Sequence, residues 1–237
     1  MALAIATNTA ALNAAASASS VNRDMETSMA RLSSGKRINS ASDDAAGVAI
    51  SSRLSAEIRG TDQAIRNSLD GQALIDTAEG AHKEIENILQ RMREVTIQAA
   101  NDTNNTQDRA NLQAEVEAMT TEIDRIAGTT TWAGANLMNA ATSTFSFQVG
   151  AATGTQNQIA VKIHKMNATG LSVGTGSASS IDVSTDVKAR SGTDLIDTAI
   201  KDVNIQRSKL GAVSNRLNHT VNNLTNISSN LSAARGG

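Results

Sequence analysis

The sequence predicts a mainly α protein, an elongated antiparallel helical bundle (a coiled-coil-like rod) with a small β-hairpin region at one end. Three observations support this fold class. Apolar residues recur at helical spacing over long stretches, no proline interrupts them, and one Trp and two Phe are the only aromatic residues. Aliphatic side chains and Met must therefore supply the core, and such residues suit close helix–helix seams.

The clearest helical pattern lies in residues 44–100, which we expect to form one long helix. Its apolar spacings alternate between three and four; this seam consists of Ala78, Ala81, Ile85, Ile88, Met92, Val95 and Ala99. A polar turn at 101–106 and a second seam that stops at Gly128 predict an antiparallel partner helix. A helix of residues 44–100 would measure ~85 Å, whereas a compact globule would span about 45 Å, so we expect a rod.

The apolar period changes to two between residues 145 and 163, which predicts a β-hairpin. Its alternating apolar members are Phe145, Phe147, Val149, Ile159, Val161 and Ile163. The segment up to Gly192 is rich in Ser, Thr and Gly, with a short strand expected at Ile181–Val183. A third long helical pattern then runs from Ile196 to Leu231.

These changes of pattern divide the chain into four parts. Residues 1–43 would form an N-terminal core helix followed by a loop, and residues 44–128 the pair of helices in the rod. Residues 129–192 would form the short hairpin and loop region, and residues 193–237 the C-terminal helix of the rod.

The stretch SSGKRINSASDD, residues 33–44, raises the question of a phosphate-binding loop. Such a loop needs a glycine five residues before its Gly-Lys pair and a Ser or Thr after the lysine. Ala30 and Arg37 occupy those positions. We interpret the stretch instead as a turn, in which Gly35 closes one helix and Ser42 or Asp43 opens the next.

Composition argues against nucleic-acid and membrane partners. The net charge is -2, and no basic stretch is interleaved with aromatic residues. No apolar run approaches the ~20 residues that span a bilayer. The Ala-rich first twenty residues contain no Lys or Arg before Arg23, so we expect a helix there and not a cleaved signal.

No constellation of residues indicates catalysis or metal binding. His82, His164 and His219 lie on separate segments without a partner at ligand spacing, and the chain contains no Cys. The carboxylates between residues 84 and 124 lie off the apolar seams, as on solvated helix faces. We expect no enzyme activity, no cofactor and no metal site.

Several longer motifs resemble bacterial flagellin, the subunit of the flagellar filament. They are RLSSG at 31–35, RINSA at 37–41, DDAAG at 43–47, LQRMRE at 89–94 and LGAVSNR at 210–216. The match covers nearly all of residues 1–128 and 193–235. The turn at residues 33–44 looks like the flagellin spoke, which joins the inner filament core to the outer helical rod.

The resemblance implies a secreted structural protein of the bacterial flagellum that self-assembles into helical filaments for motility and is exported without a cleaved signal peptide. It implies other flagellin subunits, the flagellar export and capping machinery and the flagellin-sensing Toll-like receptor as partners. Two alternatives stay open, a hook–filament junction protein and a flagellin-like surface adhesin or polysaccharide receptor. Against the latter, only Trp132 offers an aromatic platform near a candidate groove.

The resemblance also assigns three groups of residues. The predicted contact patch for a neighbouring subunit or the receptor consists of Gln90, Arg91, Glu94, Val95, Gln98 and Glu115. The spoke residues are Gly35, Arg37, Asn39, Asp43 and Asp44. The core assembly face consists of Leu12, Val21, Met25, Met29 and Leu32. Val95 stands where a leucine is usual in strongly stimulating flagellins. Its side chain is smaller by about one methylene, which would weaken the receptor contact by roughly 0.8 kcal/mol.

Two departures from the family pattern carry expectations. The segment between Gly128 and Gly192 is short, so we expect no bulky variable outer domains. Flagellins also resemble one another in a further long C-terminal core helix, whereas this sequence stops at Gly236-Gly237. Without that helix, we expect nothing within the chain to cover the core assembly face.

Overall fold

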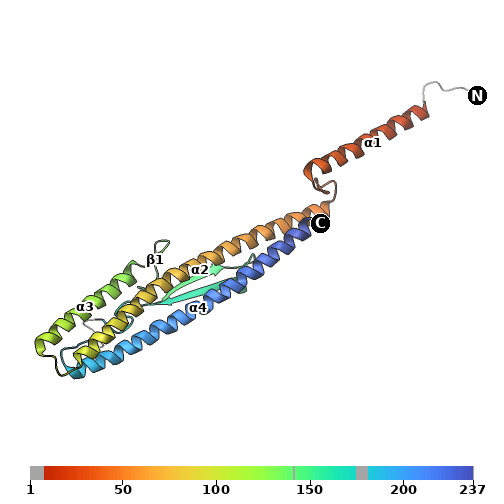
Figure 1. Ribbon diagram of the computed structural model, residues 1–237. Coiled ribbons are helices and arrows are strands. Elements are labelled where there is room, and N and C mark those ends of the chain that lie inside the picture. Colours follow the sequence, from red (N-terminus) through yellow and green to blue (C-terminus); the bar gives the residue numbers. More distant parts are fainter. Residues whose placement is uncertain (1–7, 141, 175–180, 237) are drawn as a thin grey trace, which may run out of the picture. The chain divides into compact units, whose positions relative to one another are not determined.

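The computed structural model describes residues 8–140, 142–174 and 181–236 (Figure 1). The fold is mainly helical with small antiparallel hairpins, as the sequence predicts. The elements are α1 (Thr9–Ser34), α2 (Ala45–Ala99), α3 (Thr106–Thr129), β1 (Thr131–Trp132), β2 (Ala135–Asn136), β3 (Thr142–Gln148), a 3₁₀ turn (Thr155–Asn157), β4 (Gln158–His164) and α4 (Asp186–Gly236). The chain forms two compact units: one holds the residues up to Glu57 and from Ser232 on, the other Ile58–Leu231.

Helix α1, in the first unit, has well-defined ends and no core. The Asn8 side chain accepts a hydrogen bond from the Ala11 N–H at 3.1 Å and so caps its first turn. Gly35 closes it in the left-handed region at φ 66°, and the Gly35 N–H donates to the Arg31 carbonyl. No residue of α1 is buried.

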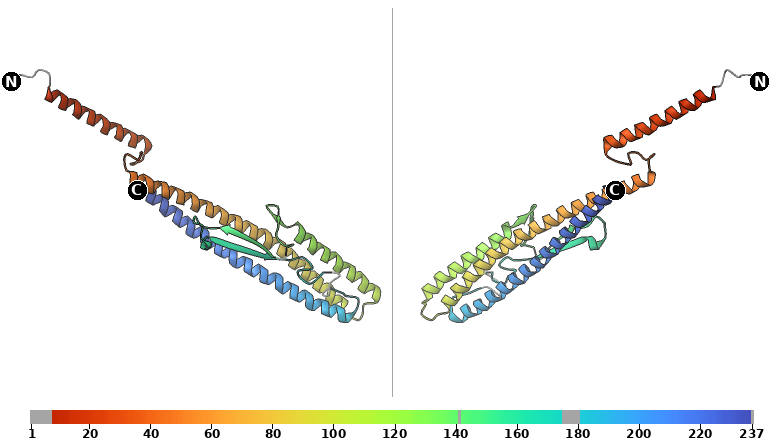
Figure 2. Two further views of the ribbon diagram at one scale, coloured as in Figure 1. Left: turned by 180° about the vertical axis from the view of Figure 1, so that it is seen from behind. Right: turned by 45° about the vertical axis from the view of Figure 1, so that its right-hand side comes forward.

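In the larger unit, α2 and α4 run antiparallel and lie side by side (Figure 2). The contacts fix this direction: Thr193 meets Thr96, whereas Ser228 meets Asp62. Helix α3 packs beside them and begins with a capping box, in which the Asn105 and Asp108 side chains each bond the other residue's backbone N–H.

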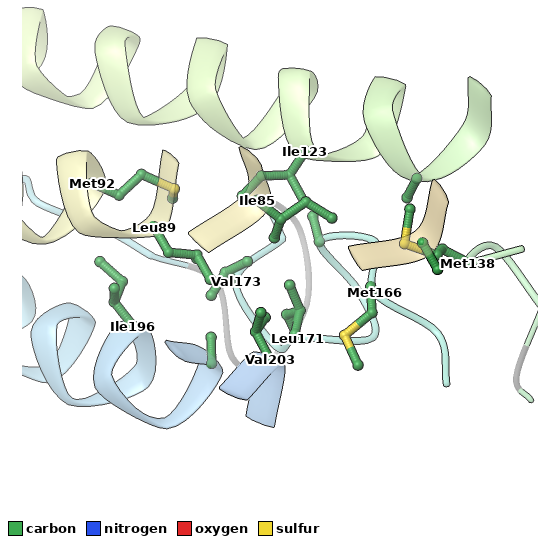
Figure 3. Close-up of a cluster of buried hydrophobic side chains, with 14 of the residues drawn as sticks. Ile85, Leu89, Met92, Ile123, Met138, Met166, Leu171, Val173, Ile196 and Val203 are labelled. Carbon is green, nitrogen blue, oxygen red and sulfur yellow. The ribbon is translucent and has the colours of Figure 1, made fainter. Parts of the chain in front are cut away.

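The core of this unit is filled from the helices and from the segments between them (Figure 3). The seam of α2 contributes Ile85 and Met92 to it, and α2 adds Leu89, which the predicted seam did not include. Met138, Met166, Leu171 and Val173 come from non-helical segments and are also buried. Their positions have no helical or strand period, so the sequence pattern did not identify them as core residues.

The hairpin of β3 and β4 has the predicted register, with Phe145 opposite Val161 and Phe147 opposite Ile159. It runs alongside α2 and α4 instead of closing one end of the bundle (Figure 1). The Asn67 side chain on α2 donates to the Gln148 carbonyl at 3.0 Å, and Gln206 on α4 donates to the Lys162 carbonyl at 2.7 Å. The predicted placement at one end is therefore wrong, because residues facing the hairpin lie in the middle of both helices.

A second, very small hairpin, of β1 and β2, follows α3. Its two-residue turn places Ala133 at φ 48° and Gly134 at φ 83°, as a type I′ turn requires. The Asn136 amide donates to the Ala127 and Gly128 carbonyls. Gly128 therefore does not stop α3, which continues to Thr129.

The expected strand at Ile181–Val183 is absent, and the reason is a side chain. Both residues are buried, but the Gln113 amide on α3 takes the place of a partner strand. Its nitrogen donates to the Ile181 carbonyl at 3.4 Å, and its oxygen accepts from the Val183 N–H at 2.9 Å.

Candidate functional site

The loop between α1 and α2 is held by two consecutive aspartates. Asp43 Oδ2 accepts from the backbone N–H groups of Ser40 at 2.9 Å and Asn39 at 3.0 Å. These hydrogen bonds favour the carboxylate and so hold the pKa of Asp43 below its ordinary value. Asp44 accepts from the Gly47 N–H at 2.9 Å. The residue that opens α2 is therefore Asp44, not Ser42 or Asp43 as expected, because Asp43 is engaged in closing the loop.

The loop borders a groove of about 650 Å³ within the same compact unit. Lys36, Arg37 and Arg235 contribute to its lining, and Arg235 donates to the Ser55 hydroxyl at 3.4 Å. Helix α1 precedes the loop where a phosphate-binding loop would follow a strand. The stretch SSGKRINSASDD is a turn that Gly35 opens by closing α1, as predicted, whereas the predicted first residue of the next helix is wrong.

The core assembly face lies open on α1. Its members are between 57% and 81% exposed: Leu12, Val21, Met25, Met29 and Leu32. Large apolar side chains at helical spacing with this exposure mark a surface for association.

The predicted contact patch is assembled around Arg91. Its guanidinium donates to Glu94 on the same helix at 3.0 Å and to Glu115 on α3 at 2.9 Å. The two carboxylates, Glu115 foremost, raise the pKa of Arg91 above its ordinary value. Arg91 is 56% and Glu115 40% exposed at their side chains, and Gln90 and Gln98 are exposed on α2.

Val95 does not belong to this patch. It is completely buried in the core with Leu89 and Met92, so its side chain cannot contact a partner. The physical reason is its place in the apolar seam of α2. The expected loss of receptor contact from its smaller side chain is therefore wrong.

A second charged cluster, which the sequence analysis missed, links α2 and α4. Arg207 forms ion pairs with Glu79 at 2.7 Å and with Glu86, and Asn204 also donates to Glu86. Arg93 and Asp197 form a further pair at 2.6 Å. These partners are more than one hundred residues apart, so no local spacing could have identified them.

His82 lies fully buried beside this second cluster. Neither ring nitrogen has a hydrogen-bond partner in the described part of the chain. Burial lowers the pKa of His82 to about 4, an effect that Glu79 opposes and Arg207 reinforces.

Residues 8–140, 142–174 and 181–236 offer neither a metal site nor a membrane span. No three His, Cys, Asp or Glu side chains gather there as metal ligands would. The helices in those ranges also lack any segment with the length and hydropathy of a bilayer span.

Comparison with protein families matches both ends of the chain. Residues 5–143 match the bacterial flagellin N-terminal helical region, and residues 193–237 match the bacterial flagellin C-terminal helical region.

Individual relatives agree with this assignment. The flagellin of Halalkalibacterium halodurans is 46% identical over 206 residues, which cover 87% of this chain and 74% of the relative. The flagellin of Bacillus subtilis is 41% identical over 258 residues, which cover 96% of this chain and 84% of the relative. Polar flagellin F of Vibrio parahaemolyticus is 48% identical over 73% of this chain, which spans about half of that relative (46%).

Solved structures share the fold. Bacillus cereus flagellin superposes with a TM-score of 0.57 at 31% identity, covering 72% of this chain and 94% of that chain. A putative flagellar hook-associated protein from Vibrio parahaemolyticus superposes with a TM-score of 0.66, covering 83% of this chain and 99% of that chain. At 15% identity, this likeness shows the fold alone. The motifs, the two family matches and these relatives show that the chain belongs to the bacterial flagellin family and is a structural subunit of the extracellular flagellar filament.

Proposed function

We propose that this flagellin contacts a neighbouring filament subunit through the patch around Arg91. The patch, without Val95, consists of Gln90, Arg91, Glu94, Gln98 and Glu115. The observation that carries the proposal is the Arg91 guanidinium, which two carboxylates from two helices hold in one orientation while more than half of the side chain stays exposed.

The energetics of this arrangement favour a role in binding. Exposed ion pairs contribute only about 0 to 1 kcal/mol to folding, so stability alone gives little reason for a three-member cluster. A preoriented arginine, by contrast, loses little conformational entropy when it binds. Arginine is also among the residues enriched at the centres of protein interfaces.

We propose that the flagellin-sensing Toll-like receptor binds the same patch. The resemblance to stimulating flagellins supports this assignment, as does the joint exposure of the residues on α2 and α3. One surface cannot serve a receptor and a neighbouring subunit at the same time. The free subunit is then the form that the receptor recognises, and assembly into the filament hides the patch.

Two further roles rest on the family resemblance. The exposed apolar face of α1 would pack against other subunits in the filament core, and the loop closed by Asp43 and Asp44 would act as the spoke. The flagellar export and capping machinery would deliver the subunit to the growing filament.

An exchange of charges tests the patch while keeping its ion pair between α2 and α3, although it replaces the Arg91–Glu94 pair by two like charges. In the double variant Arg91→Glu with Glu115→Lys, the α2 and α3 side chains still attract each other, but the charges presented to a partner are reversed. We expect filament yield and receptor activation at limiting concentration each to fall by about tenfold or more, with unchanged helicity.

The matched control exchanges another cross-helix pair, Arg93→Asp with Asp197→Arg, between α2 and α4. It should assemble and signal as the original chain does. Normal filaments and full receptor activation from the Arg91 and Glu115 variant would refute the assignment of the patch.

A further inference from the structure

We propose that Met25 and Met29 on α1 form an oxidation site, at which hydrogen peroxide converts the free subunit into a form that assembles poorly. Met25 is 57% and Met29 63% exposed, whereas the methionines of the larger unit are buried or packed against its core; these are Met92, Met119, Met138 and Met166. The modification needs only the two exposed side chains. Its effect on assembly rests on the proposed packing of α1 in the filament core.

The two methionines are open to an oxidant. No described residue of α1 is buried, and the sequence of residues 1–57 and 232–237 contains no aromatic residue, the kind of side chain against which methionine sulfur often packs. The chain also contains no Cys, whose thiolate would react with peroxide first. Exposed methionines are therefore the groups of this subunit that peroxide oxidises most readily.

The pair occupies one face of α1. A spacing of four residues places Met25 and Met29 next to each other along the helix, with Cβ atoms about 5 to 6 Å apart. Val21 and Leu32 continue the same exposed apolar surface, the core assembly face. Oxidation of the pair therefore introduces two polar groups into the middle of a surface on which assembly is proposed to depend.

The reaction transfers one oxygen atom to each sulfur. A sulfur lone pair attacks the peroxide, an S–O bond forms as the O–O bond breaks, and the peroxide is reduced to water. Each thioether loses two electrons and becomes a sulfoxide. A sulfoxide oxygen accepts hydrogen bonds, so burying it at an interface without a donor is unfavourable. Methionine sulfoxide reductases reverse the step with electrons from a thiol.

The site should act on assembly and not on folding. The described core of the larger unit contains no residue of α1, so its packing does not depend on Met25 or Met29. Packing of α1 against other subunits would in turn remove both side chains from solvent. The free subunit is then the form that an oxidant modifies, and assembly protects the site.

Mass spectrometry of the intact monomer after brief exposure to peroxide tests the site directly. Trypsin releases residues 24–31, DMETSMAR, which contain both methionines, while Met138 and Met166 fall in two other peptides. With limiting hydrogen peroxide, we expect residues 24–31 to gain oxygen about tenfold faster than either buried methionine. Equal rates of oxidation in the three peptides would overturn the proposal.

Elongation of short filament fragments tests the consequence. Monomers treated with peroxide and then freed of it should add to the fragments about tenfold more slowly than untreated monomers. Their far-UV circular dichroism should be unchanged, which would exclude unfolding as the cause. Incubation with methionine sulfoxide reductases and a thiol should restore elongation.

The double variant Met25→Leu with Met29→Leu keeps an apolar face of similar volume but cannot be oxidised there. It should elongate filaments equally well with and without peroxide. The matched control, Met119→Leu on α3, retains the oxidation site and should be inhibited as the original chain is. Equal inhibition of the leucine double variant would place the effect at another residue and overturn the proposal.

A polar double variant distinguishes failure of this proposal from failure of the proposed role of α1. Met25→Gln with Met29→Gln imitates the polarity of the sulfoxides without oxidation and should elongate filaments poorly. If the oxidised chain elongated normally but the glutamine variant did not, the oxidation proposal would fall and the packing role of α1 would stand. Normal elongation by both would refute the packing role as well.

Discussion

His82 is a buried ionisable side chain on the core-facing side of α2, between Ala78 and Ile85. Because its pKa is about 4 in the folded chain and 6.5 in the unfolded one, the unfolded chain binds the extra proton first as the pH falls. Above pH 6.5, His82 is neutral in both states and the free energy of unfolding is at its full value. As the pH falls from 6.5 toward 4, this free energy decreases, because only the unfolded chain takes up the proton. The loss amounts to about 3 kcal/mol in the free energy of unfolding.

We therefore predict that His82→Leu reduces the acid sensitivity of this flagellin. The variant should lose less stability than the original chain between pH 7 and pH 4.5, as measured by urea unfolding of the monomer. His219→Leu, which replaces an exposed histidine on α4, should behave as the original chain does. An identical dependence on pH in the His82 variant would contradict the assignment.

Two glycines of α2 should respond in opposite directions to the same substitution. An added Cβ on exposed Gly80 meets nothing within 4 Å, whereas on buried Gly71 it would lie 3.2 Å from Phe147 and 3.3 Å from Leu217. Gly80→Ala should raise the free energy of unfolding by about 1 kcal/mol. Gly71→Ala should lower it by about 1 to 3 kcal/mol because the hairpin must shift. Urea unfolding would decide, and a change of the same sign in both would refute this prediction.

At the scale of elements, Gln113 attaches the segment before α4 to α3. Gln113→Ala would leave the Ile181 carbonyl and the Val183 N–H without partners, which costs about 1 to 3 kcal/mol for each buried group. We expect faster hydrogen exchange at Val183 and a lower free energy of unfolding. Gln107→Ala, at an exposed position of the same helix where the side chain bonds Asn111, should change neither the exchange rate at Val183 nor the free energy of unfolding.

Glu at position 113 gives a finer test of the same attachment. Its carboxylate can still accept from the Val183 N–H but cannot donate to the Ile181 carbonyl. Gln113→Glu loses the donor bonds to Ile181 and Glu117 and places its charge four residues from Glu117, so its free energy of unfolding should lie below that of the original chain. A stability equal to that of the original chain would show that the bond to Ile181 contributes little.

At the scale of the whole molecule, α1 and the seam of α2 should differ in protection. Helix α1 contains no buried residue, and isolated helices are marginal in water. Amide hydrogens of α1 should exchange quickly in the dilute monomer, while those between Ala78 and Ala99 exchange slowly. In assembled filaments, α1 should become protected. Strong protection of Val21 to Leu32 in the monomer would contradict the expected need for neighbouring subunits.

The sequence predicted the helices and the main hairpin because each has a regular apolar period. It did not predict the buried loop residues Leu171 and Val173, which have no period, nor the Arg207 ion pairs, whose partners are distant in the chain. Val95 is instructive because two arguments disagreed about it. The helical seam placed it inside and the family comparison placed it in a contact patch, and the seam was right.

The hairpin of β1 and β2 gives this flagellin a built-in optical reporter. Trp132 packs, partly buried, against the core at that hairpin, and it is the only Trp in a chain without Tyr. Intrinsic fluorescence therefore records the surroundings of one indole, next to the end of α3, whereas far-UV circular dichroism records the helices. When the two signals are followed through one thermal transition, coincident curves would mean that this corner and the helical bundle melt together, and an earlier change in emission would mean that the corner opens first.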